Sequence, residues 1–256
     1  MYDSAKILQT ASVAGELLLQ NGAEIFRVQE TMLHILKAYD VDDANVFVLS
    51  NGIFASICEG TERAQSIVRN VPLGSVNLSR IDEINSLSRN IAEHKIDPQE
   101  ALDALQAIKK KTYAKKIVHI LFCGIATSAF ACLFGGGLAE WLCAFVAGTL
   151  LQCYQFFVAR HSMRFGNCFI GGALATLVAC VCQLIYPALQ VNPVIIGSIM
   201  PLVPGFAFTS GLREAIGGDY LCGLIHILDA ILTGVCIALG VYGAMSVFSL
   251  LGGVVL

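Results

Sequence analysis

From residue 117 onward the sequence consists of long apolar stretches that are almost free of charge. All but three of the 16 Lys and Arg residues, and all but four of the 19 Asp and Glu residues, lie before residue 117. About 20 consecutive apolar residues are enough for a helix to span the hydrocarbon core of a bilayer, which is roughly 30 Å thick. We therefore expect the chain to change solvent near residue 116 and to be embedded in a membrane beyond it.

Five segments are long and apolar enough to be predicted as transmembrane helices. Basic residues lie before the first segment, between the second and third (Arg160 and Arg164), and after the fourth (Arg213). The connections near Glu140 and between the third and fourth segments carry none, so the positive-inside rule predicts a cytoplasmic N-terminus and an external C-terminus. The predicted spans are residues 117–138, 141–159, 165–186, 193–212 and 220–250.

Before the first span, the chain has the periodicity of a small folded domain. Apolar residues recur at spacings of three and four over residues 4–20 and 23–39, which predicts two amphipathic helices. The side chains predicted to be buried are Ile7, Leu8, Ala11, Ala14 and Leu18 in the first helix and Ile25, Val28, Leu33, Ile35 and Leu36 in the second.

A β-hairpin is predicted around Asn51-Gly52. Val46–Leu49 precedes this pair and Ile53–Ile57 follows it, and both runs are rich in β-branched or aromatic residues. Asn-Gly is favoured where a two-residue hairpin turn requires positive φ angles. Residues 65–71 alternate sufficiently to predict a third strand.

Two further helices, over residues 78–93 and 97–111, complete the predicted domain. The expected architecture is an N-terminal cytoplasmic α/β domain, residues 1–115, followed by a membrane α-helical bundle of five transmembrane helices, residues 116–256.

The fourth predicted span is interrupted by Pro201 and Pro204. Because proline has no N–H, these residues are expected to leave the carbonyls of Gly197 and Met200 without helical partners near the middle of the membrane. Transporters build solute sites from broken helices, because unpaired backbone is tolerated at that depth only beside protein or a water-filled cavity. The amides after Gly205 would form a helix N-terminus suited to a carboxylate. A simple proline kink, packed by neighbouring helices, is the alternative interpretation.

Asp229 is the second candidate functional feature. It lies ten residues after Asp219, which corresponds to about 15 Å along a helix, and a carboxylate at that depth is a functional candidate by default. His226 and Thr233, one turn before and one turn after, share its helix face, so this face could bind a cation or relay a proton. The alternative is a neutral Asp229 that is hydrogen-bonded to a neighbouring helix.

Several other classes of function receive no support. The net charge of −3, without interleaved basic and aromatic residues, argues against a nucleic-acid partner. Cys180 and Cys182 lack the spacing of a zinc site, and no cofactor is predicted. No phosphate loop, nucleophile elbow or His-Glu-x-x-His pattern occurs, so we expect a protein that is not an enzyme and that draws energy from a gradient or a partner.

Short motifs along the chain resemble the threonine/serine exporter family. The motifs are Leu17-Leu18-Leu19, then Gly22-Ala23-Glu24 with Arg27-Val28, then Pro201-Leu202-Val203-Pro204-Gly205, and finally the Gly218-Asp219 step into the last span. This order covers nearly the whole chain and adds interest to Pro204, Gly205 and Asp219. Single-chain members of the family are about twice this length. The resemblance therefore implies the larger subunit of the split, two-component form.

The resemblance further implies a secondary transporter of the inner (plasma) membrane. Its partner would be a smaller integral membrane subunit, and without such a partner a homo-oligomer would be expected. The substrates would be small carboxylate-bearing metabolites, either threonine and serine or a dicarboxylate such as succinate. The alternative is a membrane-anchored enzyme or sensor with its activity in the N-terminal domain. The predicted substrate-binding residues are Gly197, Met200, Pro201, Pro204, Gly205, Asp219, His226 and Asp229.

Overall fold

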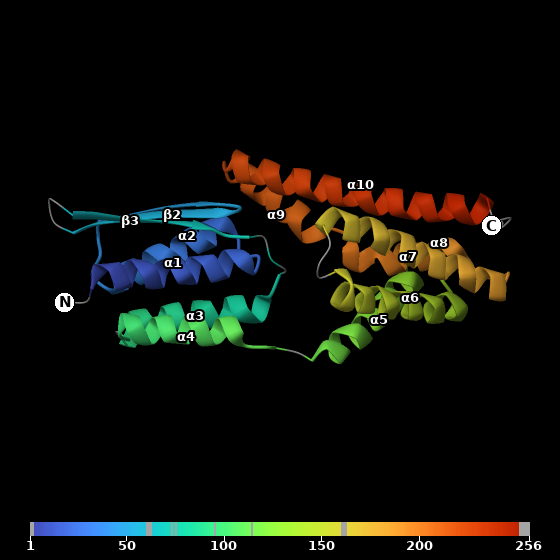
Figure 1. Ribbon diagram of the computed structural model, residues 1–256, viewed down its shortest axis with the longest axis horizontal. Helices are drawn as coiled ribbons and strands as arrows, with labels where there is room; N and C mark the ends of the chain where they lie inside the picture. The colour runs from blue at the N-terminus through green and yellow to red at the C-terminus, as the bar shows by residue number, and fades with distance from the viewer. Residues whose placement is uncertain are drawn as a thin grey trace. The chain divides into compact units, whose positions relative to one another are not determined.

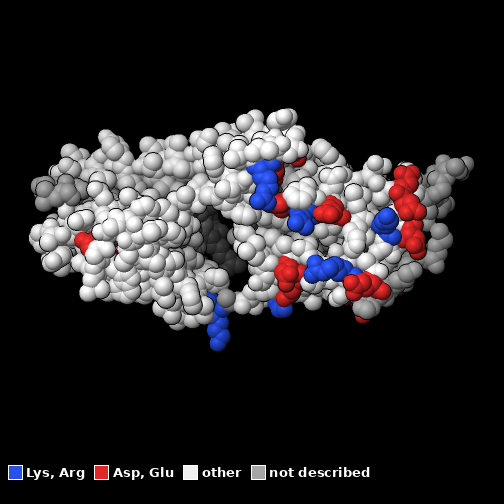
Figure 2. Space-filling view, turned by 180° about the vertical axis from the view of Figure 1, so that it is seen from behind, with Lys and Arg blue, Asp and Glu red and all other residues white. Residues whose placement is uncertain are grey.

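The computed structural model forms two compact units, Met1–Tyr113 (unit 1) and Ala114–Leu256 (unit 2) (Figure 1). Figure 2 shows Lys, Arg, Asp and Glu side chains gathered over unit 1, with few over the visible face of unit 2. Arg160, which contributed to the predicted orientation, lies outside the described residues. The structure describes residues 3–59, 63–72, 74, 76–94, 96–113, 115–159 and 163–250.

Unit 1 has three layers, with a pair of helices between a sheet and a second pair of helices (Figure 1). The sheet is antiparallel in the order β1-β2-β3, and α1 and α2 pack against it. Helices α3 and α4 cover the other side of the central pair. The elements are α1 (Ser4–Gln20), α2 (Ile25–Ala38), β1 (Ala44–Leu49), β2 (Gly52–Glu59), β3 (Arg63–Asn70), α3 (Leu78–His94) and α4 (Pro98–Lys110).

The central helix pair confirms the predicted buried stripe of α1 but corrects that of α2. Leu33 is 36% exposed, whereas Met32 is fully buried and lies against Gly15 of α1. Val28, Met32 and Leu36 are spaced by four residues and therefore share one helix face, and Leu33 lies outside it. The expectation that Leu33 is buried was wrong, because the predicted apolar stripe included Leu33, which lies beside the buried face of α2.

The hairpin is confirmed, but its turn lies one residue earlier than predicted. Leu49 pairs with Gly52, so the turn consists of Ser50 and Asn51, and Gly52 is already the first residue of β2. All three residues are described, and neither the two turn residues nor Gly52 has a positive φ. The register follows the core, because it places Val48 opposite Ile53 on the buried face, and a slip of one residue would turn one of them outward.

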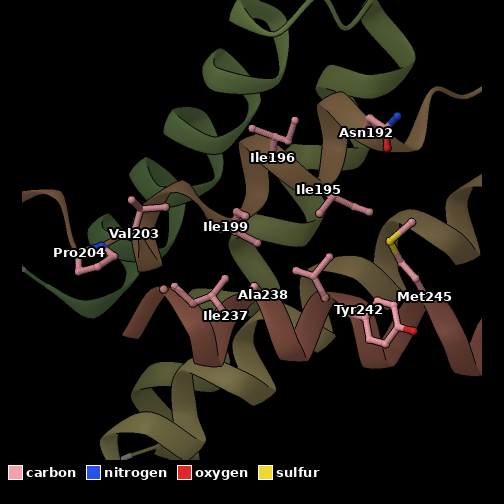
Figure 3. A pocket seen from close by; sticks show the side chains of 12 residues that line it. Asn192, Ile195, Ile196, Ile199, Val203, Pro204, Ile237, Ala238, Tyr242 and Met245 are labelled. Carbon is pink, nitrogen blue, oxygen red and sulfur yellow. The ribbon is translucent and has the colours of Figure 1, made fainter. Parts of the chain in front are cut away.

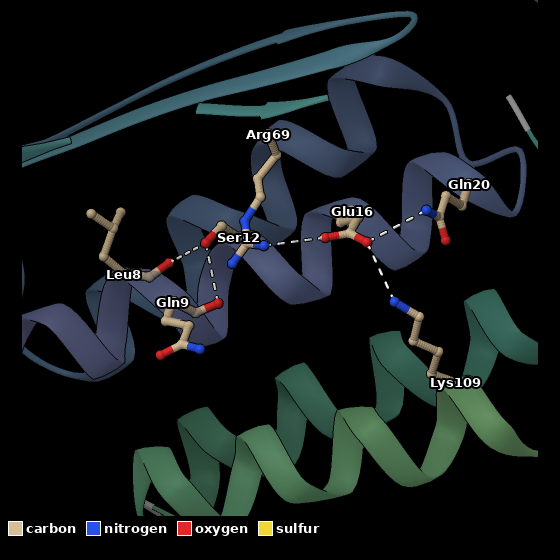
Figure 4. Close-up of polar contacts among 7 residues, drawn as sticks. All are labelled: Leu8, Gln9, Ser12, Glu16, Gln20, Arg69 and Lys109. Atoms are coloured by element: carbon tan, nitrogen blue, oxygen red, sulfur yellow. Dashed lines mark hydrogen bonds and ion pairs between the residues drawn. The ribbon is translucent and has the colours of Figure 1, made fainter. Parts of the chain in front are cut away.

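Glu16 of α1 links three elements of unit 1 (Figure 4). Its carboxylate oxygens lie 3.8 Å from Arg69 Nη1 of β3 and 3.5 Å from Lys109 Nζ of α4, and it accepts a hydrogen bond from Gln20 Nε2 at 3.4 Å. Only 16% of the Glu16 side chain is exposed. A carboxylate so shielded from water requires partners, and these two cations tie the sheet and α4 to α1.

Glu83 of α3 holds the segment that leads out of unit 1. Its carboxylate pairs with Lys111 and accepts a hydrogen bond from Tyr113 Oη at 3.1 Å. Arg80 adds a hydrogen bond to the carbonyl oxygen of Lys111 at 3.0 Å. The hydrogen bond from Lys111 lowers the pKa of Glu83 below its ordinary value of 4.5.

Glu83→Gln is expected to lower the melting temperature Tm of the full chain at pH 7, because the amide cannot replace the charged acceptor. A carboxylate whose pKa is depressed by folding contributes stability above its ordinary pKa and loses this contribution as the pH falls through the depressed value. The Tm difference from wild type, followed by circular dichroism in detergent, should therefore shrink as the pH falls below 4.5 and vanish once the pH is below the lowered pKa. Glu30→Gln, on an exposed position of α2, is the control. A Glu83→Gln difference that persists in acid would contradict this account.

Unit 2 is entirely helical over its described residues. Helices α5, α7 and α10 are long and apolar enough to cross a membrane, and a bent pair formed by α8–η2 and α9 adds a fourth candidate. Helix α6 has 20 residues but contains Glu140, Gln152 and Gln155 and is not among these candidates. The second predicted span, residues 141–159, therefore stays a prediction. The elements are α5 (Lys116–Leu133), α6 (Leu138–Phe157), α7 (Arg164–Ile185), α8 (Val191–Ile199), η2 (Met200–Leu202), α9 (Gly205–Ile216) and α10 (Tyr220–Leu250).

Small and hydroxyl-bearing residues bring the helices of unit 2 into close contact. A Cβ atom added at Gly148 of α6 would lie 2.1 Å from Thr127 Oγ1 of α5, and this hydroxyl donates a hydrogen bond to the Ala144 carbonyl oxygen at 2.8 Å. Gly240 of α10 similarly faces Phe169 of α7. Such contacts are the usual basis of helix association in lipid, where apolar burial alone provides little driving force.

Glu140 joins two connections at one end of unit 2. Its Oε2 accepts a hydrogen bond from the Gly137 amide at 2.8 Å, and its Oε1 accepts one from the Gln190 amide at 2.9 Å. The residue is 7% exposed, so both amides depend on this carboxylate. It thereby fixes the α5–α6 turn to the α7–α8 connection.

Glu140→Ala is expected to destabilise unit 2 by about 2 kcal/mol or more, because an unpaired buried amide costs roughly 1–3 kcal/mol. Glu140→Gln retains one acceptor and should lose less. Trp141, the only tryptophan in the sequence, lies next to this position and reports unfolding through its fluorescence. Leu138→Ala, on an exposed position two residues earlier, is the control. Equal unfolding curves for Glu140→Ala and wild type would refute the proposed role of Glu140.

Candidate functional site

The predicted break in the fourth span is confirmed. Helix α8 ends at Ile199, η2 contains Pro201, and α9 begins at Gly205 immediately after Pro204. The segments on either side of the break are bent by 57°. Met200, Pro201, Pro204 and Gly205 therefore lie together at the break, as the sequence indicated.

The carbonyl groups at the break are not free, contrary to expectation. The Gly197 carbonyl oxygen accepts a hydrogen bond from the Met200 amide, and the Met200 carbonyl oxygen accepts one from the Val203 amide at 3.1 Å. The chain tightens into a 3₁₀ turn, in which each bond spans three residues instead of four and does not need the missing proline N–H. The break is thus a bend, which we call the corner, whose backbone carbonyl groups at Gly197 and Met200 are hydrogen-bonded.

Gly197 and Gly205 have different surroundings. A Cβ atom at Gly197 would lie 2.6 Å from the Ala131 amide nitrogen and 2.8 Å from the Thr127 carbonyl oxygen, so this glycine allows α8 to pack closely on α5. A Cβ atom at Gly205 would meet no atom within 4 Å. Helix packing thus explains Gly197, whereas space remains open beside Gly205 at the start of α9.

A groove of about 550 Å³ lies beside the break, between α8 and α10 (Figure 3). Asn192 and Tyr242 provide the only polar side chains among its lining residues, and no charged side chain is present. A carboxylate would therefore find no cation in this groove. Its lining residues are Asn192, Ile195, Ile196, Ile199, Val203, Pro204, Gly234, Ile237, Ala238, Val241, Tyr242 and Met245.

The cation absent from the groove is found at the start of α7, where Arg164 pairs with Asp229 of α10. Arg164 Nη1 donates to Asp229 Oδ1 at 2.9 Å, and Nη2 donates to Oδ2 at 2.7 Å. The Arg164 side chain is 52% exposed and that of Asp229 is 17% exposed. Two parallel hydrogen bonds of this kind form the strong, geometrically specific contact between a guanidinium and a carboxylate.

The alignment of α7 and α10 places Asp229 level with the start of α7. Arg164 meets Asp229 and Gly172 meets Ile237, and α7 and α10 run in the same direction in Figure 1. The helices are therefore parallel, and residues 229–250 lie alongside α7. The 31 residues of α10 extend about 46 Å, which exceeds the roughly 30 Å hydrocarbon core. The first turns of α10 therefore extend past the start of α7, and Asp229 lies near that start. The expected depth of about 15 Å for Asp229 stays a prediction.

His226 and Asp229 share a face of α10 but have different partners. His226 Nδ1 lies 2.7 Å from Glu214 Oε2 of α9, and Glu214 is buried. Thr233 is also buried, and its hydroxyl has no hydrogen-bond partner in the described part of the chain. Asp219 Oδ1 accepts a hydrogen bond from the Cys222 amide at the start of α10. The predicted polar face of α10 is therefore divided between α9 and α7.

Arg164 and Glu214 were missed as candidate residues. Arg164 contributed only to the predicted orientation, and Glu214 was not singled out. The available signal was simple: unit 2 contains few charged residues, so each carboxylate near a span requires a partner among them.

Comparison with known proteins gives one family. A family model described as "Putative threonine/serine exporter" matches residues 9–248. Two relatives named "Probable succinate transporter subunit YjjP" come from Klebsiella aerogenes and Escherichia coli. They are 26% and 24% identical over 92% and 94% of this chain, and the matches cover 91% and 94% of their own lengths.

A longer relative, from Corynebacterium glutamicum, is named "Threonine/serine exporter". It is 24% identical over 84% of this chain, but the match covers only 45% of its own length. No solved structure gives a significant match.

Proposed function

Because this chain belongs to the threonine/serine exporter family, we propose that it is the larger subunit of a secondary transporter for small carboxylate-bearing metabolites. It would export threonine and serine, or a dicarboxylate such as succinate, across the inner membrane. The observation that carries this proposal is the family match over residues 9–248, which includes both the break and the polar face of α10.

The need for a second subunit is supported by the lengths of the relatives. The chain matches more than nine tenths of two relatives that are named as subunits, but less than half of one that is named as an exporter. A smaller integral membrane protein would supply the part of the transporter that the longer relative carries in the same chain, outside the matched region. In its absence, two or more copies of this chain would have to form the path.

The proposed membrane arrangement has five spans, with the N-terminal domain in the cytoplasm and the C-terminus outside. The parallel course of α7 and α10 supports it, because the third and fifth of five successive spans must cross in the same direction. In this arrangement Arg164 and Asp229 lie at the cytoplasmic end, where an exported solute would enter.

The proposed solute site comprises the break and the polar residues of α10. Pro201, Pro204 and Gly205 shape the corner, and Gly205 leaves open space beside it. Asp219 directly precedes α10, and His226 and Asp229 lie on the part of α10 that pairs with α9 and the start of α7. Gly197 and Met200 would support the corner through packing and 3₁₀ hydrogen bonds rather than contact the solute.

An export assay in cells tests the proposal. The chain would be expressed with the candidate small membrane subunit in a strain that lacks its own exporters of threonine, serine and succinate. Co-expression should increase the appearance of at least one of these solutes in the medium, and neither subunit alone should do so. If the full chain alone converted a metabolite chemically, the alternative of a membrane-anchored enzyme would replace this proposal.

A further inference from the structure

We propose that Arg164 binds the carboxylate of the transported solute, and that the Asp229 carboxylate occupies its place when no solute is bound. This inference rests on the proposed function and identifies the residue that recognises the substrate class. It changes the role expected for Asp229, which becomes a competitor of the solute rather than a direct contact.

The geometry of the Arg164–Asp229 pair is that of a bound carboxylate. Both Asp229 oxygens are engaged by separate guanidinium nitrogens, at 2.9 and 2.7 Å. A free carboxylate would be held by the same two nitrogens in the same way, because guanidinium and carboxylate match as planar, bidentate partners. The side chain of Asp229 is thus an intramolecular stand-in for the group to be recognised.

The surroundings of Arg164 favour an exchangeable anion. Half of its side chain is exposed, so a solute can reach it, and it is the first residue of α7. The unpaired amides of a helix N-terminus add positive potential at this point. Among the described residues of unit 2, the other Lys and Arg residues are Lys115 and Lys116 at the start of α5 and Arg213 near the end of α9.

The carboxylate is the group that the named substrates of the relatives have in common. Succinate, threonine and serine differ in their other groups, but each carries a carboxylate. The groove between α8 and α10 offers no charged side chain, so the cation must come from elsewhere. Arg164 provides it, because at the guanidinium group the carboxylate of the solute can replace that of Asp229.

A nearby hydroxyl group could hydrogen-bond to the Asp229 carboxylate when the solute displaces it from Arg164. Thr233 lies one helical turn further along the same face of α10, and its buried hydroxyl has no hydrogen-bond partner in the described part of the chain. A shielded carboxylate that loses its cation is costly unless other groups hydrogen-bond to it. Donation from Thr233 Oγ1 would reduce this cost.

The test compares Asp229→Asn with Arg164→Gln in the two-subunit transporter, reconstituted in vesicles with labelled serine or succinate. Asp229→Asn removes the competing charge and should lower KM severalfold. Arg164→Gln should abolish saturable transport. Arg164→Lys, which keeps the charge but cannot form the two parallel hydrogen bonds of a guanidinium, should raise KM. Arg89→Gln, an exposed substitution in unit 1, is the control and should leave KM unchanged.

Folding is measured in parallel, because a purely structural ion pair makes a different prediction. Such a pair would make Asp229→Asn and Arg164→Gln lose transport together, each with a similar fall in Tm, and this result would overturn the inference. Unchanged KM in Arg164→Gln would also overturn it. In either case the wild type still transports. Failure of the wild-type complex to transport any of these carboxylates would instead overturn the proposed function, and with it this assignment.

Serine methyl ester provides a test that requires no variant. It retains the amine and hydroxyl of serine but lacks the free carboxylate, so it should not compete with labelled serine. Competition equal to that of unlabelled serine would contradict recognition through Arg164.

Discussion

Gly240→Ala should sharply reduce the amount of folded protein, although it adds a single methyl group. A Cβ atom at this position would lie 2.0 Å from the Phe169 carbonyl oxygen and 2.9 Å from the carbonyl carbon of the same residue. The obstacle is backbone, so it cannot move aside as a side chain would, and α7 must separate from α10. We expect a loss of about 3 kcal/mol or more, at or above the upper end of ordinary overpacking.

Gly234→Ala is the matched control on the same helix. A Cβ atom there would meet no atom within 4 Å, and alanine favours a helix over glycine by about 0.8–1.0 kcal/mol. Gly234→Ala should therefore be neutral or slightly stabilising. Size-exclusion profiles and thermal unfolding in detergent measure both variants. If Gly240→Ala were as stable as Gly234→Ala, the described packing of α7 on α10 would be wrong.

Joint replacement of Pro201 and Pro204 by alanine should reduce transport tenfold or more while the protein remains folded. Alanine restores the two amide donors, so α8 can continue as a regular helix through the corner. A continuous helix would lose the bend of 57° and the open space before Gly205. The expected reduction corresponds to about 1.4 kcal/mol or more in the rate-limiting step.

Pro187→Ala is the control for this double variant, because Pro187 lies on the exposed connection between α7 and α8. Initial rates of solute efflux from reconstituted vesicles, normalised to folded protein, give the comparison. Wild-type rates in the double variant would show that the corner is not needed for transport.

The positions of the helices and of the break could be predicted because they depend on local sequence. Apolar length indicated α5, α7 and α10, and the missing N–H groups of Pro201 and Pro204 indicated where the fourth span breaks. The hairpin was predicted for the same reason. The exact position of its turn could not be predicted, because it depends on which face of the sheet is buried. A local pattern defines an element, but it does not define the partners of that element.

The polar contacts of the candidate site could not be predicted, because they depend on packing between distant segments. Arg164 and Asp229 are 65 residues apart and meet only because α7 and α10 run parallel in one particular alignment. The sequence likewise did not indicate which part of the 31-residue α10 lies alongside α7. The hydrogen bonds that satisfy the Gly197 and Met200 carbonyls arise from a 3₁₀ turn, for which the proline pattern gave no signal.

The central claim is that this membrane protein, with a second membrane subunit, moves small carboxylates across the bilayer. The most direct measurement uses vesicles that contain both purified subunits and are loaded with labelled serine, threonine or succinate. We predict saturable efflux of at least one of the three that depends on an imposed gradient and on the presence of both subunits. Retention of all three solutes by vesicles in which both subunits are folded and inserted would contradict the claim.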